Sequence, residues 1–123
     1  MLNKTKGQVE ADISKAITLF EKEYLGRGPK KVRSFIIEDM ILIRLLGVLT
    51  PAEEKLSEEI EGAQLIKQFR RRLIESSRKV LEKIIDSNTN VKVKSLHTDV
   101  SSHTGERIFV FTLDRNLEKE LIK

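Results

Sequence analysis

The sequence contains two histidines and 19 acidic residues, and these side chains could act as general bases or bind a metal ion. His97 and Asp99 are two residues apart, so on a β-strand they would lie on the same face. Together with Glu38 and Asp39 they form a candidate polar site for proton transfer or metal binding. The alternative is a His97–Asp99 hydrogen bond that stabilises a hairpin. We favour this alternative, because a lone acid–base pair is weak evidence for catalysis.

Residue types exclude several other chemistries. The chain has no cysteine, so disulfides, thiolate nucleophiles and cysteine-containing zinc sites are excluded. The sequence has neither a His-x-x-x-His spacing nor a serine in a nucleophile-elbow context. We therefore expect a protein that is not an enzyme and that uses no metal or cofactor.

A glycine-rich basic segment is a second candidate site, because backbone amides and cationic side chains together can bind a small anion. Its residues are Gly26, Arg27, Gly28, Lys30, Lys31 and Arg33. The segment follows a predicted helix, however, and the dipole at a helix C-terminus repels anions. The glycines are equally well explained by the end of the helix and a turn.

A third candidate is the basic stretch 63–94, which carries nine basic and three acidic residues. Such a stretch could bind nucleic acid or an anionic lipid surface. On a helix, however, Arg71 has Glu75 four residues away, and this spacing favours a solvated face with internal ion pairs. The sequence also shows no aromatic platform for base stacking. Nucleic acid is therefore the less favoured partner.

The elements that position the first two candidates are a helix and a hairpin. Apolar residues recur at helical spacing over residues 9–25, and Gly26 then predicts the end of this helix. Residues 32–46 are rich in aliphatic side chains and predict two strands joined at Glu38-Asp39.

The middle of the chain is predicted to be helical. Thr50 and Glu53 are spaced as a capping box, with Pro51 suited to the first turn. Gly62 predicts a bend before a longer helix over residues 63–86.

Two strands and a short helix are predicted to follow. Residues 91–101 and 107–113 predict a second hairpin, with a β-bulge near Lys94-Ser95. Asp114 could cap a final helix that ends at Leu121. The predicted order is α-β-β-α-α-β-β-α, an α+β fold in which two antiparallel hairpins form one sheet and the helices pack on it.

The long predicted helix has two apolar stripes. The main stripe is Ile66, Phe69, Leu73, Val80 and Ile84, and the second is Ile74, Leu81 and Ile85. A helix that lies on a sheet needs only one stripe. The second must contact the first helix, another part of the chain or a second subunit, and we predict a homodimer formed through it.

The composition predicts a single small domain with a mildly basic surface. The chain has 123 residues and a formal net charge of +4, which permits contact with anionic partners without requiring it. We find no apolar signal core near the start and no stretch of about 20 apolar residues. We therefore expect a cytoplasmic protein without a transmembrane segment, free or peripheral at the membrane.

Several stretches, taken in their order and spacing, resemble one family. They are Gly26-Arg27-Gly28-Pro29, Glu38-Asp39-Met40-Ile41, Leu46-Gly47-Val48-Leu49-Thr50-Pro51-Ala52-Glu53, His97-Thr98-Asp99-Val100-Ser101, and Gly105-Glu106-Arg107 followed by Phe109-Val110-Phe111-Thr112-Leu113. In these stretches the chain resembles the MpsC-like proteins, which are named as a component of a Na+-translocating, membrane-potential-generating system. The resemblance implies one domain over residues 1–123 with a core at about 9–114.

The resemblance supplies no catalytic or binding residue. It implies a non-enzymatic accessory or regulatory component of a membrane ion-transport system, with a membrane protein as a candidate partner. The alternative, from the residues themselves, is a free-standing module that binds a small anion or nucleic acid. It would use the Gly26–Arg33 loop and the basic stretch 63–94.

Overall fold

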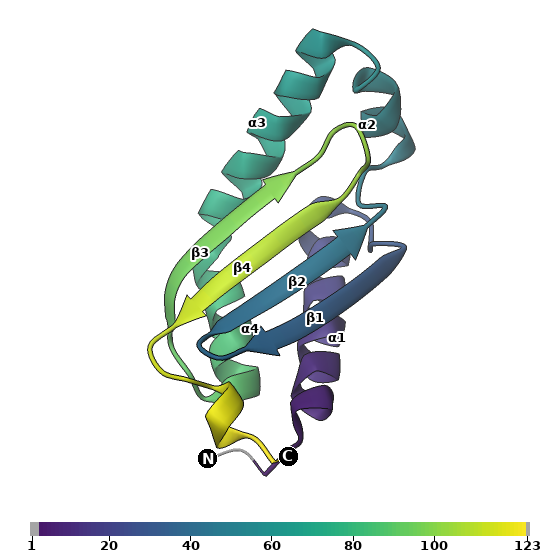
Figure 1. The fold of residues 1–123 in the computed structure, drawn as a ribbon. Helices are drawn as coiled ribbons and strands as arrows, with labels where there is room; N and C mark the ends of the chain where they lie inside the picture. The colour runs from purple at the N-terminus through teal and green to yellow at the C-terminus, as the bar shows by residue number, and fades with distance from the viewer. Residues whose placement is uncertain (1–2, 123) are drawn as a thin grey trace.

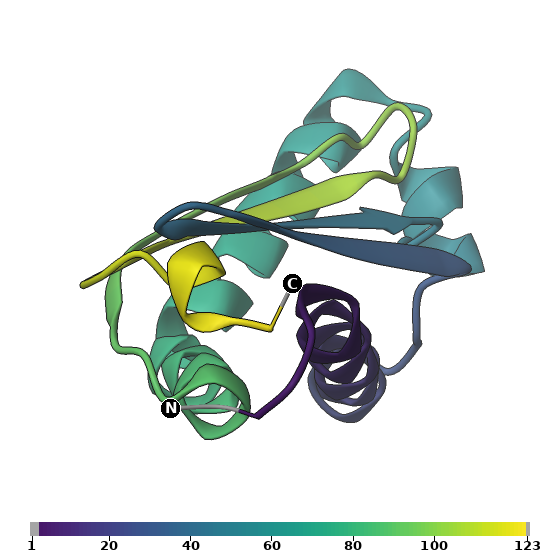
Figure 2. The same ribbon diagram turned by 60° about the horizontal axis from the view of Figure 1, so that its bottom comes forward.

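The computed structural model describes residues 3–122, which fold into two layers. One layer is a four-stranded antiparallel sheet, and the helices cover one of its faces (Figures 1 and 2). The elements are α1 (Lys6–Leu25), β1 (Lys31–Ile37), β2 (Met40–Leu46), α2 (Pro51–Leu56), α3 (Ile60–Ser76), α4 (Arg78–Thr89), β3 (Val93–Val100), β4 (Arg107–Leu113) and the 3-10 turn η1 (Glu118–Glu120). The predicted α+β class and the order of helices and strands are confirmed.

The two hairpins join into one sheet through their second strands. The strand order is β1-β2-β4-β3, so β2 and β4 are central and β1 and β3 are the edges. Leu42 on β2 lies between Phe35 on β1 and Val110 on β4. The register between β3 and β4 shifts between Val93 and Ser95, which confirms the predicted bulge.

Local signals set the ends of α1. The Thr5 hydroxyl accepts a hydrogen bond from the Gln8 amide, and the Gln8 side chain accepts one from the Thr5 amide. These two bonds form a capping box. Gly26 ends the helix in the left-handed conformation with φ 81°, as predicted.

The central helices differ from the prediction of one long helix over residues 63–86. Helix α3 begins at Ile60, so Gly62 lies inside it. A Cβ on Gly62 would lie 2.0 Å from the Leu56 carbonyl oxygen, so glycine lets α3 pack against the end of α2. The helix then breaks at Ser77, with φ −102° and ψ 8°, and α4 begins at Arg78.

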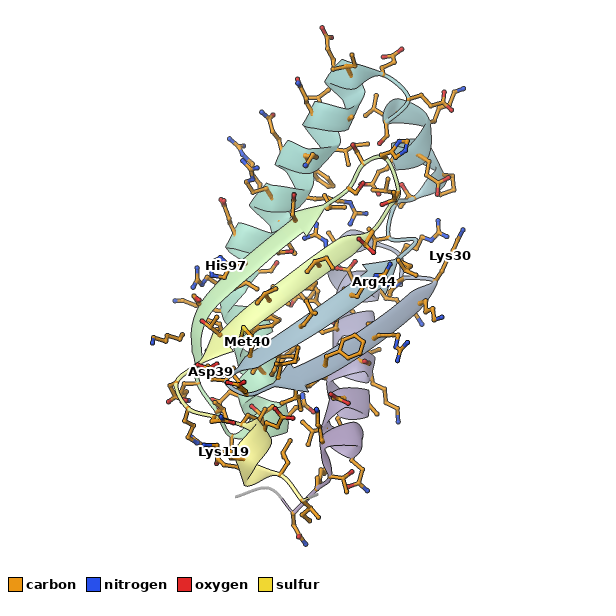
Figure 3. All side chains as sticks on the ribbon, in the orientation of Figure 1. Lys30, Asp39, Met40, Arg44, His97 and Lys119 are labelled. Atoms are coloured by element: carbon orange, nitrogen blue, oxygen red, sulfur yellow. The ribbon has the colours of Figure 1, made fainter. Side chains whose placement is uncertain are left out.

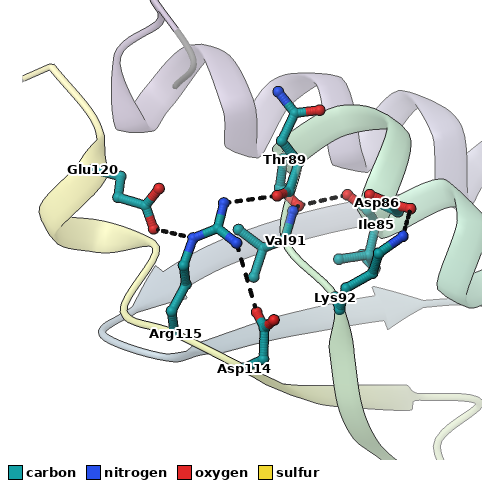
Figure 4. Close-up of polar contacts among 9 residues, drawn as sticks. Ile85, Asp86, Thr89, Val91, Lys92, Asp114, Arg115 and Glu120 are labelled. Carbon is teal, nitrogen blue, oxygen red and sulfur yellow. Dashed lines mark hydrogen bonds and ion pairs between the residues drawn. The ribbon is translucent and has the colours of Figure 1, made fainter.

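The predicted final helix is also shorter than expected. Asp114 does not cap a helix. Instead, the Asn116 side chain accepts a hydrogen bond from the Lys119 amide, and only the single turn η1 forms. The preceding Arg115 ties this segment to the end of α4 by donating to the Asn90 carbonyl at 2.7 Å and to Glu120 at 2.7 Å (Figure 4).

The side of the helical region that faces the core differs from the predicted one. Ile74, Leu81 and Ile85 are buried within the chain, whereas Phe69 is 57% exposed. Helix α4 packs against α1. The residues predicted to mediate self-association therefore belong to the core of the single chain and do not form a surface between copies.

Alternate residues along the strands divide the sheet into a covered and an open face. Ile36, Ile41, Ile43, Phe109 and Phe111 point toward the helices and are fully buried. The residues between them lie on the open face, which Figure 3 shows from the front with Met40, Arg44 and His97 labelled. No helix of the described chain covers this face (Figure 2).

Candidate functional site

The structure does not bring the predicted polar residues together. Glu38 and Asp39 form the turn between β1 and β2, while His97 and Asp99 lie on the opposite edge strand β3. The His97 Nε2 atom bonds to the Ser95 hydroxyl at 3.2 Å, so the predicted His97–Asp99 hydrogen bond is not formed. Within residues 3–122, no cluster of three or more acidic or histidine side chains could hold a metal ion.

The Gly26–Arg33 loop makes structural contacts. The Arg27 Nη1 atom donates to the Leu49 carbonyl at 3.0 Å, and the Lys30 amide donates to the Leu46 carbonyl at 2.8 Å. A Cβ on Gly28 would lie 2.9 Å from the Lys22 side chain. Lys31 and Arg33 lie on β1, where the Arg33 guanidinium sits 5.3 Å from the centre of the Phe35 ring. The Arg27 and Arg33 side chains thus make separate contacts and do not converge on one point.

An ion pair that the sequence analysis missed joins the first turn of α2 to α3. Arg70 on α3 is 1% exposed and donates from Nε to Glu53 Oε2 at 2.8 Å and from Nη2 to Glu53 Oε1 at 2.7 Å. The Nη2 atom also donates to the Val48 carbonyl at 2.9 Å. This two-point geometry is the strongest form of an arginine–carboxylate pair. Hydrogen bonds from Arg70 and Thr50 lower the pKa of Glu53, although burial opposes them.

Two further charged side chains are buried nearby without matching partners. Glu21 on α1 is fully buried, and neither of its carboxyl oxygens has a hydrogen-bond partner. Arg107 on β4 is 1% exposed and donates from Nη1 to the Thr98 hydroxyl at 2.9 Å, while its Nε and Nη2 atoms have no partner. An unmatched buried polar group is costly, so these atoms mark an unusual part of the core.

The electrostatics of this buried cluster (Glu21, Glu53, Arg70 and Arg107) follow from burial. Loss of solvation raises the pKa of Glu21 to about 7, although the positive charges of Arg107 and Arg70 oppose the shift. Burial likewise lowers the pKa of Arg107 to about 10, and the charge of Glu21 opposes that change. Near neutral pH, the Glu21 carboxyl therefore exists in both the protonated and the ionised form.

A cleft beside the buried cluster separates α3 from the edge strand β3. Its main cavity is about 370 Å³ in volume and is lined by Arg71, Ile74, Glu75, Arg78, Leu96, His97 and Thr98. A second cavity of about 30 Å³ adjoins it and is lined by Lys67, Arg71, Thr98, Asp99, Val100 and Arg107. Arg71 and Thr98 line both cavities, and Arg107 connects the smaller one to the buried cluster.

Sequence periodicity could have located these residues. Glu21 continues the four-residue spacing of Ile13 and Ile17, and Arg70 lies midway between Ile66 and Ile74. Arg107 alternates inward with Phe109. The helical or strand period places each of these charged residues on the core-facing side of its element. The prediction missed them because it considered only apolar residues when assigning the core.

Comparisons with known proteins agree over most of the chain. The family model described as "Na+-translocating membrane potential-generating system (MpsC)" matches residues 5–115. The chain is 51% identical over 122 residues to "Uncharacterized protein YbcI" of Bacillus subtilis (strain 168), which covers 99% of this chain and 98% of that protein. It is 24% identical over 105 residues to "Uncharacterized protein YrhF" of the same organism, and this match covers 85% of this chain and 86% of that protein.

No solved structure matches the chain. Among residues 3–122, no helix has the length and apolar character that crossing a membrane requires. The family match confirms the resemblance found in the sequence. This chain belongs to the MpsC family.

Proposed function

We propose that the chain is a non-enzymatic accessory component of a membrane ion-transport system and acts through contacts with other proteins, as a homodimer. The family description, which covers residues 5–115, supports the link to a Na+-translocating system. The membrane-embedded parts of such a system would be its partners. The observation that carries the proposed mode of action is the apolar open face of the sheet.

The open face is apolar at its centre. Phe35, Leu42 and Val110 lie side by side in one row across β1, β2 and β4, and Ile37 and Met40 lie beside each other in the next row. All five side chains are at least partly exposed. A sheet that faces water on one side normally alternates apolar residues with polar ones. A continuous apolar face of this kind therefore indicates a surface that another protein layer covers.

Charges at the two ends of the open face favour a second copy as that layer. Arg33 and Arg44 are directly paired in the register, and like charges in this position repel each other. Arg44 is paired with Glu106 at 2.6 Å, whereas Arg33 makes no ion pair with the described residues. At the opposite end, the turn residues Glu38 and Asp39 make no ion pair with the described residues. A two-fold axis that lies in the plane between two stacked faces and runs perpendicular to the strands would place the basic end of one copy over the acidic end of the other.

The oligomeric state tests this arrangement. We expect sedimentation equilibrium to show a dimer at micromolar concentration, and we expect Leu42→Lys to convert it to a folded monomer. Leu65→Lys is the matched control, because Leu65 is an exposed leucine on α3. A monomeric wild-type chain, or an L65K variant that dissociates as readily as L42K, would contradict the dimer.

The accessory role has a separate test in Bacillus subtilis lacking the 51%-identical relative. We expect this strain to lose part of the Na+-dependent membrane potential, measured with a potentiometric dye over a range of sodium concentrations. We expect this chain to restore the potential and its L42K variant to restore less. A membrane potential that is unchanged by the deletion at every sodium concentration would refute the role.

A further inference from the structure

We propose that the cleft between α3 and β3 binds a small molecule through a phosphate or carboxylate group, which is held between Arg71 and the buried Arg107. The proposal does not depend on the accessory role, and the cleft lies at the β3 edge of the sheet, whereas the apolar rows of the open face lie on β1, β2 and β4. It also differs from the Gly26–Arg33 loop, whose Arg27 side chain is engaged with a carbonyl of the chain itself.

Two arginines that form no ion pair with the described residues line one small cavity. Arg107 is almost fully buried, lines the 30 Å³ cavity and leaves its Nε and Nη2 atoms unbonded. Arg71 lines the same cavity from α3 and forms no ion pair within the described part of the chain. A guanidinium presents its N–H groups in a planar fork that matches carboxylate and phosphate oxygens. An anionic group bound beside Arg71 in this cavity would supply a counter-charge for both guanidinium groups.

The other charges of the cleft leave it positive. Lys67 pairs with Asp99 at 3.4 Å, and Arg78 pairs with Glu82 at 3.0 Å, so these charges largely compensate each other. Glu75 is the remaining carboxylate on the lining of the main cavity. Glu21 forms no ion pair with Arg107 and is only partly ionised near neutral pH, since its pKa is raised to about 7. The arginines therefore lack a full counter-charge within the chain.

The size and walls of the cleft define the ligand class. The main cavity, at about 370 Å³, lies within the range of sites for small molecules. Ile74 and Leu96 give it two apolar walls, and none of its lining residues is phenylalanine, tyrosine or tryptophan. A compact molecule with one anionic group fits this combination, whereas a nucleic-acid strand would need stacking platforms.

Phenyl phosphate and benzoate are suitable probes, because they share an aromatic body and differ in the anionic group. Each is titrated into 15N-labelled protein in a low-salt buffer without phosphate or carboxylate. We expect saturable shifts of the Thr98 and Val100 amides with at least one probe, and the tighter probe identifies the preferred group. No saturable shift with either probe up to about 10 mM overturns the proposal.

Substitutions separate a built site from general charge attraction. Arg71→Gln should weaken binding about tenfold or more. The matched control is Arg72→Gln, which removes the neighbouring exposed charge of the same helix and lines neither cavity. Equal weakening by both variants overturns the proposal. Arg107→Lys, checked for folding by near-UV circular dichroism, should also weaken binding, and unchanged binding in this folded variant likewise overturns it.

Discussion

Arg70 on α3 and Glu53 on α2 form a two-point ion pair in the interior, with N–O distances of 2.8 and 2.7 Å. The same Glu53 Oε1 atom accepts a hydrogen bond from the Thr50 amide at 2.9 Å, as part of the capping box of α2. One carboxylate thus begins a helix and neutralises a buried arginine. This double role fixes the short helix α2 against α3.

Removing the arginine should be strongly destabilising. We expect Arg70→Met to lower the free energy of unfolding by about 3 kcal/mol, because it leaves Glu53 largely desolvated without its partner. Lys55→Met is the control, since the Lys55–Glu58 pair at 3.5 Å is exposed and should contribute less than about 1 kcal/mol. Urea unfolding measures both values, and similar losses in the two variants would argue against the buried pair.

Glu21 should make the wild-type protein less stable as the pH rises. Its pKa is raised from 4.5 to about 7 in the folded state, so the folded state binds this proton more tightly than the unfolded state does. The resulting stability is complete below pH 4.5 and is lost as the pH rises through 7. The difference is of the order of 3 kcal/mol.

Glu21→Gln should remove this pH dependence, because a glutamine does not titrate. We expect the variant to unfold at higher urea than the wild type at pH 8, and the difference should narrow toward pH 5. Urea unfolding at several pH values measures the effect. Parallel pH profiles for the two proteins would show that Glu21 does not titrate in this range.

Gly62→Ala should destabilise the protein, although alanine is the better helix former by about 1 kcal/mol. The added Cβ would lie 2.0 Å from the Leu56 carbonyl oxygen, so α2 or α3 must move. Gly7→Ala in α1 is the control, because a Cβ there would meet nothing within 4 Å. Thermal unfolding should show opposite signs for the two substitutions, and a stabilising G62A change would contradict the close packing.

Glu38→Asn should stabilise the β1–β2 turn. Glu38 has φ 54°, a left-handed conformation that asparagine adopts more readily than glutamate. We expect a gain of about 0.5–1 kcal/mol in unfolding free energy. Asp39→Asn makes the same change of charge at a neighbouring position outside the left-handed region and should give no such gain. An equal gain from both would assign the effect to charge.

Local signals allowed the strands, the end of α1 and the start of α2 to be predicted. Gly26 ends α1 through its own conformational freedom, and Thr50 with Glu53 begins α2 through bonds across three residues. The bulge between Val93 and Ser95 changes the spacing of apolar residues along the strand. Each of these features depends on neighbours in sequence, and so each leaves a visible pattern.

The core contacts of α3 and α4 could not be predicted from apolar residues in the same way. Arg70 and Ser77 occupy buried positions in the row that includes Ile66, Ile74 and Leu81, so the true core face contains two polar residues. Phe69, by contrast, is exposed and appeared to continue an apolar stripe. Whether Arg70 or Phe69 faces the core depends on Glu53 and Val48, which accept the hydrogen bonds of Arg70. Both acceptors are distant from Arg70 in sequence.

The candidate cleft depends on contacts between distant segments for the same reason. Arg71 and Arg107 are separated in sequence by the end of α3, all of α4 and strand β3, yet they line one cavity. Only the register between β3 and β4 places Arg107 opposite Val100 and within reach of Thr98. The sequence showed a basic stretch, but the partner strand that completes the cleft becomes visible only in three dimensions.

The bulge in β3 also limits how copies of this chain can add to one another. Strands with free edges can pair with further strands without end and form fibres. Here one edge strand is bent by the register shift at Val93 and Ser95, and the other carries Lys31 and Arg33 at one end. Growth along the sheet is therefore disfavoured at both edges. The proposed association through the open face would instead close after two copies and give an assembly of defined size.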